Sequence, residues 1–214
     1  LKQCGFGGIL ADEMGLGKSV QLIALLLSRY QRNTGEMGDG SLAPSLIVCP
    51  ASLVYNWGAE FTKFAPSFNA VVVAGTKAER RTAIGRAFRA DEPTVLITSY
   101  DLLRRDVDDY TANEQRFNVM ALDEAQYIKN HTTKIAKAVK AVAADHRFAL
   151  TGTPIENRLS ELWSIFDFLM PGLLGSYKRF HERYELPISN ARAADGSTAE
   201  GRAAAQVNPE AARV

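Results

Sequence analysis

Short apolar stretches alternate along the chain with longer stretches in which apolar residues recur at helical spacing. The apolar stretches are rich in β-branched residues and too continuously apolar to have a face in water, which is typical of parallel strands covered by helices on both faces. The predicted strands are GGILA (7–11), SLIVCP (45–50), AVVVAG (70–75), TVLITS (94–99), FNVMALDE (117–124) and RFALTG (147–152), and the predicted helices span about 18–31, 52–65, 77–90, 100–105, 132–144 and 156–169. The pattern predicts an α/β domain with a doubly wound, mainly parallel sheet, whose ligands bind beyond the carboxyl ends of the strands.

The composition is that of an ordinary globular chain, and its net charge and apolar runs limit which partners can be expected. The 214 residues are 46% hydrophobic and 23% charged, and 25 Lys and Arg against 24 Asp and Glu leave a formal charge of only +1. A nucleic acid or another polyanion would therefore have to be recognised by local sites. The longest apolar cluster, Leu22 to Leu27, is far shorter than the ~20 residues of a membrane span, so we expect no membrane partner. Cys4 and Cys49 are far apart and form no CxxC pair, which fits a reducing compartment.

The two ends of the chain also carry expectations. The first residues, LKQCGFGGIL, run directly into a predicted strand without an initiator Met, so we expect a segment of a longer protein. From Ser189 onward the sequence consists largely of Ala, Gly, Ser and charged residues and contains no aromatic residue. We expect 189–214 to be a flexible tail or a partial element, and 33–44 to be a solvated loop.

Residues 12–19, DEMGLGKS, match a phosphate-binding loop except at Asp12, where that pattern has its first glycine. The preceding strand and the following helix supply the context that the motif needs, which opposes the alternative of a chance turn. Gly15 and Gly17 let the backbone approach a phosphate, Lys18 can bind the β- and γ-phosphates, and the Ser19 hydroxyl can hold Mg²⁺. The predicted ATP-binding residues are Asp12, Glu13, Met14, Gly15, Leu16, Gly17, Lys18 and Ser19.

A pair of acids ends the predicted strand 117–124, at the edge of the sheet where the phosphate loop is expected. Asp123 is predicted to bind Mg²⁺ and Glu124 to activate the attacking water, with Lys18 as the third catalytic residue. Adjacent acids are also common at helix N-termini, where the helix dipole favours them. The phosphate loop favours the catalytic interpretation.

Three further strand ends carry hydroxyl groups. After RFAL, the residues Thr151, Gly152 and Thr153 form a small turn that could sense a γ-phosphate, while Thr153 and Glu156 also fit a simple capping box. The segments CPASLVYNW (49–57) and TSYDLLRRD (98–106) could bind a nucleic acid backbone through N–H and hydroxyl groups. Helix capping alone is the alternative for each.

Five motifs together resemble the Swi/Snf family of superfamily-two helicase-like DNA-dependent ATPases. They are ILADEMGLGKSVQ, LIVCPASLVYNWGAEF, VLITSYDLLRRD, ALDEAQYIKN and LTGTPIENRLSELWSIFDFLMPGLLG, which correspond to motifs I, Ia, Ib, II and III. In this family DEMGLGKS is the usual form, so Asp12 is expected, and DEAQ followed by IKN differs from the DEAD-box RNA helicases. The block 151–175 resembles the bacterial members.

The resemblance implies a P-loop NTPase of RecA-like fold, with residues 1–188 as the N-terminal ATP-binding lobe of a motor. Such a motor uses ATP and Mg²⁺ to translocate on double-stranded DNA and to remodel DNA-bound proteins, and its protein substrate here is unknown. It would act in the cytoplasm at the nucleoid in bacteria, or in the nucleus in eukaryotes. The residues expected to couple nucleotide state to DNA are Gln126, Thr151, Gly152 and Thr153, and those expected along the DNA backbone are Pro50, Ser52, Ser99 and Tyr100.

Two family features are missing from the sequence, and both affect the expected activity. The adenine-recognition motif that precedes motif I is not complete, and after Thr153 only a short segment remains, so we expect no second RecA-like lobe within these 214 residues. That lobe would supply an arginine worth roughly 10³ to 10⁵ in rate in related enzymes. We therefore expect this chain alone to bind nucleotide weakly and hardly to turn it over. The alternatives are an RNA helicase lobe and a truncated, nucleotide-gated protein-interaction module.

Overall fold

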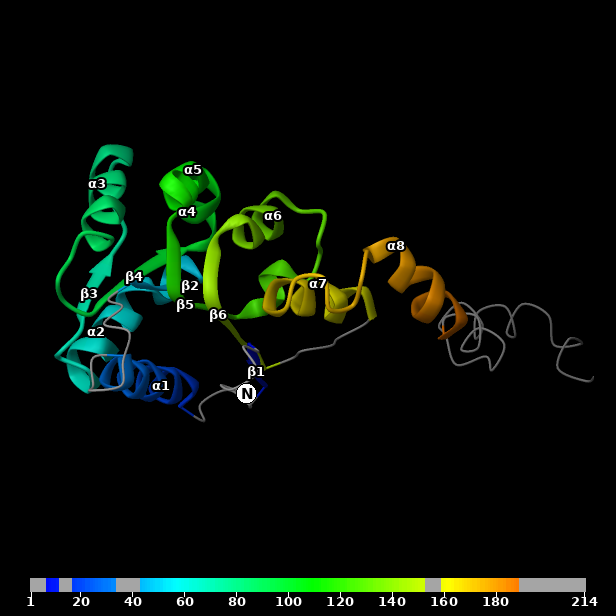
Figure 1. Cartoon of the computed structure of the whole chain (residues 1–214), viewed down its shortest axis with the longest axis horizontal. Helices are drawn as coiled ribbons and strands as arrows, with labels where there is room; N and C mark the ends of the chain where they lie inside the picture. The colour runs from blue at the N-terminus through cyan, green and yellow to red at the C-terminus, as the bar shows by residue number, and fades with distance from the viewer. Residues whose placement is uncertain (1–6, 12–16, 34–42, 153–158, 189–214) are drawn as a thin grey trace, which may run out of the picture.

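The computed structural model describes residues 7–11, 17–33, 43–152 and 159–188. Within them, six parallel strands form one sheet in the order β1-β6-β5-β2-β4-β3 (Figure 1). The strands are β1 (Gly8–Leu10), β2 (Ser45–Cys49), β3 (Asn69–Val72), β4 (Thr94–Ser99), β5 (Arg116–Asp123) and β6 (Ala143–Leu150). The helices are α1 (Lys18–Asn33), α2 (Val54–Phe64), α3 (Lys77–Ala87), α4 (Tyr100–Arg105), α5 (Val107–Thr111), α6 (Lys134–Ala141), α7 (Leu159–Leu169) and α8 (Tyr177–Phe180).

The order of the strands explains where the helices lie. The chain first runs outward across the sheet, from β1 through α1 to β2 and through α2 to β3, and then returns through α3, α4, α5 and α6 to β4, β5 and β6. Because crossovers between parallel strands are right-handed, the two directions place their helices on opposite faces. Helices α1 and α2 accordingly cover one face, and α3 to α6 cover the other, together with α7 (Figure 1). The predicted doubly wound α/β fold is confirmed.

The strands bury both of their faces, as their continuous apolar sequence predicted. In β2, Leu46 and Val48 pack among the helices of the return path, whereas Ile47 and Cys49 pack against α1 and α2. Every residue of β2 and β4 is buried. A strand of this kind cannot expose either face to water, so the sites open to ligands lie at its ends.

Several element boundaries differ from those expected. The predicted helix 132–144 is too long: α6 ends at Ala141, and β6 already begins at Ala143, which pairs with Arg116. The first residues of β6 are half-exposed Ala and charged residues, so no apolar run marked them. The short helices α5 and α8 were not predicted. Residues 34–42, most of the expected loop, and the expected tail 189–214 lie outside the described residues.

The return path has one consequence for function. It inserts β5 and β6 between β1 and β2, and the register places Asp123 opposite Leu150 and Leu150 opposite Leu10. The carboxyl ends of β1, β5 and β6 therefore lie side by side at one edge of the sheet. No helix among the described residues has the length and apolarity to cross a membrane.

Candidate nucleotide-binding site

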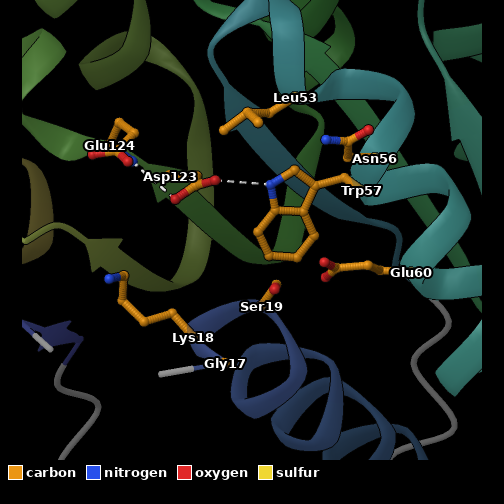
Figure 2. A pocket seen from close by; sticks show the side chains of 9 residues that line it. All are labelled: Gly17, Lys18, Ser19, Leu53, Asn56, Trp57, Glu60, Asp123 and Glu124. Atoms are coloured by element: carbon orange, nitrogen blue, oxygen red, sulfur yellow. Dashed lines mark hydrogen bonds between the residues drawn. The ribbon is translucent and has the colours of Figure 1, made fainter. Parts of the chain in front are cut away.

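A pocket of about 330 Å³ opens at the carboxyl edge of the sheet, between the start of α1, the first turns of α2 and the end of β5 (Figure 2). The structure therefore brings the predicted phosphate-binding and acidic residues together, although they are more than a hundred positions apart in sequence. The pocket is lined by Gly17, Lys18, Ser19, Leu53, Asn56, Trp57, Glu60, Asp123 and Glu124.

Three predicted loop residues form the floor of the pocket. Gly17 has a φ of 69°, in the left-handed region that favours glycine, and its carbonyl accepts the backbone N–H of Gln21 at 3.1 Å. Lys18 and Ser19 are the first residues of α1, so their side chains lie where the positive end of the helix dipole is directed at the pocket (Figure 2). This arrangement suits an anion such as a phosphate. The other predicted loop residues, from Asp12 to Leu16, lie outside the described residues.

Asp123 is the last residue of β5, and both of its carboxylate oxygens accept hydrogen bonds. Trp57 Nε1 donates to Oδ2 at 2.9 Å, and the backbone N–H of Glu124 donates to Oδ1 at 3.0 Å. Burial raises the pKa of Asp123, against the effect of the Trp57 hydrogen bond, which lowers it. Each oxygen has a second lone pair, so the carboxylate can still act as a ligand of a cation.

Glu124 leaves the strand in a left-handed conformation, with φ 55° and ψ 55°. A residue other than glycine rarely adopts it, because it is strained. The hydroxyl of Tyr100 lies at this turn and donates to the carbonyl oxygen of Asp123 at 2.8 Å, with the carbonyl of Glu124 at 3.4 Å. Burial, followed by the charge of Asp123, raises the pKa of Tyr100, so the hydroxyl keeps its proton and remains a donor.

Two of the predicted coupling residues connect Glu124 to the end of β6. Gln126 Nε2 donates to Glu124 Oε2 at 2.7 Å, and the Thr151 hydroxyl donates to Gln126 Oε1 at 3.0 Å. Thr151 is fully buried, and its backbone N–H donates to the carbonyl of Leu10 at 3.1 Å. The three side chains therefore form one chain of hydrogen bonds from the acid to the strand before the phosphate loop. Their coupling role itself stays a prediction.

The remaining predicted coupling residues and the predicted DNA-contact residues after β2 differ in how far they are exposed. Gly152 follows Thr151 and is exposed, whereas Thr153 and the capping partner Glu156 lie outside the described residues. Pro50 and Ser52 reach the surface at the start of the 3₁₀ turn Ala51–Leu53.

The two predicted DNA-contact residues at the end of β4 lie inside the protein. The Ser99 hydroxyl accepts the N–H of Leu102 and caps α4, and Tyr100 packs inside, only 2% exposed. The side chains of Ser99 and Tyr100 thus have internal partners, and DNA contact by any of the four predicted residues stays a prediction.

Sequence reasoning missed the wall formed by α2. Leu53, Asn56, Trp57 and Glu60 recur at the spacing of one helical face and all line the pocket. The sequence signal that could have revealed this wall was the stripe itself. Its helix follows β2, and β2 lies next to β5, the strand that ends at Asp123. A tryptophan and a phenylalanine four residues apart are more typical of a core, and Trp57 and Phe61 do pack there.

The side chains present fit a magnesium nucleotide. Mg²⁺ prefers oxygen ligands and is usually held by one or two carboxylates and the phosphates of the substrate. Ser19 and Asp123 offer a hydroxyl and a carboxylate on one pocket, and Lys18 offers an ammonium group for phosphate oxygens. A parallel sheet in this order, with these residues at its carboxyl edge, defines a RecA-like nucleotide-binding domain of the P-loop class.

Comparison with known proteins identifies the family. Residues 1–206 match the SNF2-related domain, and the chain belongs to this family. It is 44% identical over 201 residues to the TATA-binding protein-associated factor MOT1 of Saccharomyces cerevisiae, covering 92% of this chain and 10% of the relative. It is 48% identical over 185 residues to an uncharacterized ATP-dependent helicase of Mycoplasma pneumoniae, covering 86% and 17%.

A solved structure agrees with this assignment. The SWI2/SNF2 ATPase core of Sulfolobus solfataricus in complex with double-stranded DNA superimposes with a TM-score of 0.73 at 40% identity, covering 88% of this chain and 36% of that chain. The predicted family and RecA-like fold are therefore confirmed. The chain spans only about a tenth to a fifth of the curated relatives it matches.

Proposed function

We propose that this chain is the ATP-binding lobe of a DNA-dependent ATPase that translocates on double-stranded DNA and remodels protein–DNA complexes. The observation that carries the proposal is the pocket in which Lys18 and Ser19 face Asp123 and Glu124 (Figure 2). This pocket combines phosphate-binding groups with two acids, as hydrolysis of a nucleoside triphosphate requires.

The relatives support two parts of the proposal: duplex DNA as the nucleic acid, and a DNA-bound protein as the target of remodelling. A Bacillus subtilis relative, 41% identical over 194 residues, is a putative ATP-dependent helicase/translocase. The Sulfolobus ATPase core binds double-stranded DNA, and MOT1 is a factor associated with the TATA-binding protein. By analogy, we propose duplex DNA and a DNA-bound protein as the partners of the motor that contains this chain.

Each side chain of the pocket has a defined task in this proposal. Lys18 binds phosphate oxygens, and Ser19 and Asp123 hold Mg²⁺, which neutralises phosphate charge when bound. Glu124 orients the attacking water and accepts its proton, while Gln126 holds the Glu124 carboxylate in place. Thr151 senses the state of the site through Gln126, and Gly152 and Thr153 extend this response toward DNA.

The motor needs more than this lobe. We propose that a second RecA-like lobe closes over the nucleotide and supplies the arginine that stabilises the transition state, so the 214-residue chain alone hydrolyses ATP very slowly. The complete protein would act at the nucleoid in the cytoplasm of a bacterium, or in the nucleus of a eukaryote. The predicted bacterial origin stays a prediction.

ATP hydrolysis by the complete motor, measured with duplex DNA, with RNA and without nucleic acid, tests the proposal. We expect stimulation by duplex DNA and its loss in Lys18→Ala, because that change removes the phosphate-binding ammonium group. Stronger stimulation by RNA would instead identify an RNA helicase. Nucleotide binding without turnover under every condition would identify a nucleotide-gated interaction module.

A further inference from the structure

One side chain of the pocket has no part in the hydrolysis described above, yet it is bonded to one of the acids. Trp57 lies one turn into α2, and its indole Nε1 donates to Asp123 Oδ2 at 2.9 Å (Figure 2). The indole is only 3% exposed, and it packs with Phe61 in the apolar layer beneath α2. It therefore cannot move away from the carboxylate without disturbing the core.

The hydrogen bond has a specific effect on Asp123. The terminal torsion of an aspartate is broad, so a carboxylate without partners rotates freely between orientations. Here the Glu124 N–H holds Oδ1 and the Trp57 indole holds Oδ2, and together they fix the carboxylate plane. An indole N–H is only a donor, so it orients the oxygen but cannot compete with it for a cation.

We propose that Trp57 is the positioning residue of the metal site: it holds the Asp123 carboxylate in the orientation that binds Mg²⁺ together with a nucleotide. The inference rests on the proposed function and specifies which residue outside the phosphate loop and the acids prepares the site. Partners of this kind, which touch a metal ligand and not the metal, typically change metal affinity by about 10- to 100-fold when they are lost.

The experiment compares nucleotide affinity with and without metal in the complete motor, because the 214-residue chain alone is expected to bind nucleotide weakly. Binding of a fluorescent ATP analogue is measured by polarisation in saturating Mg²⁺ and in EDTA, and the ratio of the two affinities gives the contribution of the metal. The variant is Trp57→Phe, which removes the N–H and keeps an aromatic ring in the core. Its matched control is Trp163→Phe, because the Trp163 indole donates to the Gly175 carbonyl, and Trp163 does not line the pocket.

We expect Trp57→Phe to lower the contribution of the metal about tenfold and to leave affinity in EDTA unchanged, whereas Trp163→Phe changes neither. A purely structural role would reduce both affinities of Trp57→Phe equally, and that result, or an unchanged ratio, would overturn the proposal. If Trp57→Phe does not fold, benzothienylalanine at position 57 replaces the N–H by sulfur in almost the same shape, and the same ratio decides. If the unaltered motor and its Trp163→Phe variant bind no Mg²⁺-nucleotide, the proposed function itself is wrong, and the inference is wrong with it.

Discussion

The ends of β5 and β4 are built from similar sequence and behave in opposite ways. Each strand is apolar and has polar residues at its end: Asp123 and Glu124 in one case, and Ser99 and Tyr100 in the other. The acids are partly exposed and line the pocket. Ser99 and Tyr100 are 4% and 2% exposed and bond to groups of the protein itself.

The difference arises from the backbone that follows each strand. After β4 the chain enters α4 at once, and Ser99 in an extended conformation becomes the N-cap of that helix. After β5 the left-handed conformation of Glu124 turns the chain first, and only then does the 3₁₀ turn Ala125–Ile128 begin. Whether a polar residue at a strand end is exposed to the pocket or buried therefore depends on the turn that follows. The end of β4 also supports the end of β5, because the Tyr100 hydroxyl donates to the carbonyl of Asp123.

The largest expected effect on turnover comes from neutralising Glu124. Glu124→Gln should lower ATP turnover of the complete motor by roughly 10²- to 10⁴-fold, because the amide cannot accept a proton from water. Nucleotide binding should remain, since the phosphate-binding groups are unchanged. Steady-state hydrolysis and equilibrium nucleotide binding measure the two effects, with exposed Glu182→Gln as the control. Unchanged turnover in Glu124→Gln would show that another group is the base.

An intermediate effect on stability and turnover is expected at Tyr100, through which the end of β4 contacts the end of β5. Tyr100→Phe leaves the carbonyl of Asp123 without its donor and should lower the free energy of unfolding by about 1–3 kcal/mol. Turnover should fall as well, though less than in Glu124→Gln, because the turn at Glu124 loses support. Urea denaturation and hydrolysis rates test this, with Tyr55→Phe, whose side chain is exposed, as the control. Full turnover in Tyr100→Phe would show that the turn holds without the hydroxyl.

The smallest expected effects distinguish the helix-capping role of Ser99 from the proposed DNA contact of Ser52. Ser99→Ala removes the N-cap hydroxyl of α4 and should lower stability by about 1 kcal/mol, with little change in DNA affinity. Ser52→Ala should leave stability unchanged and, if the hydroxyl contacts a phosphate, weaken DNA binding by about two- to tenfold regardless of base sequence. Thermal denaturation and DNA-binding titrations of both variants measure this. The reverse outcome would place the DNA contact at the end of β4.

The sequence predicted the fold and several residues that line the pocket, because both depend on local patterns. Continuous apolar runs mark strands buried on both faces, and the loop around Lys18 and the acid pair Asp123 and Glu124 are compact motifs. The start of β6 at Ala143 was missed because half-exposed alanines and charges there leave no apolar run. Its strand conformation comes from pairing with β5, which is a tertiary effect.

The supporting contacts of the site could not be predicted in the same way. That Gln126 lies between Glu124 and Thr151 depends on β5 and β6 being neighbours, which only the strand order determines. The indole of Trp57 reaches Asp123 because β2 adjoins β5, and in sequence it is indistinguishable from a core tryptophan. Motifs therefore identified side chains that the structure brings into one pocket, while the partners that hold them became evident only from topology.

The place of β1 at the edge of the sheet determines when the site can form during folding. In the described part of the chain β1 pairs with β6 alone, through contacts such as Gly8 with Phe148, so the first strand in sequence needs the last one. Closing so long a loop for a strand of three residues is entropically unfavourable until the rest of the sheet exists. We therefore expect the start of α1 and the acids to come together late in folding, after β6 has been synthesised.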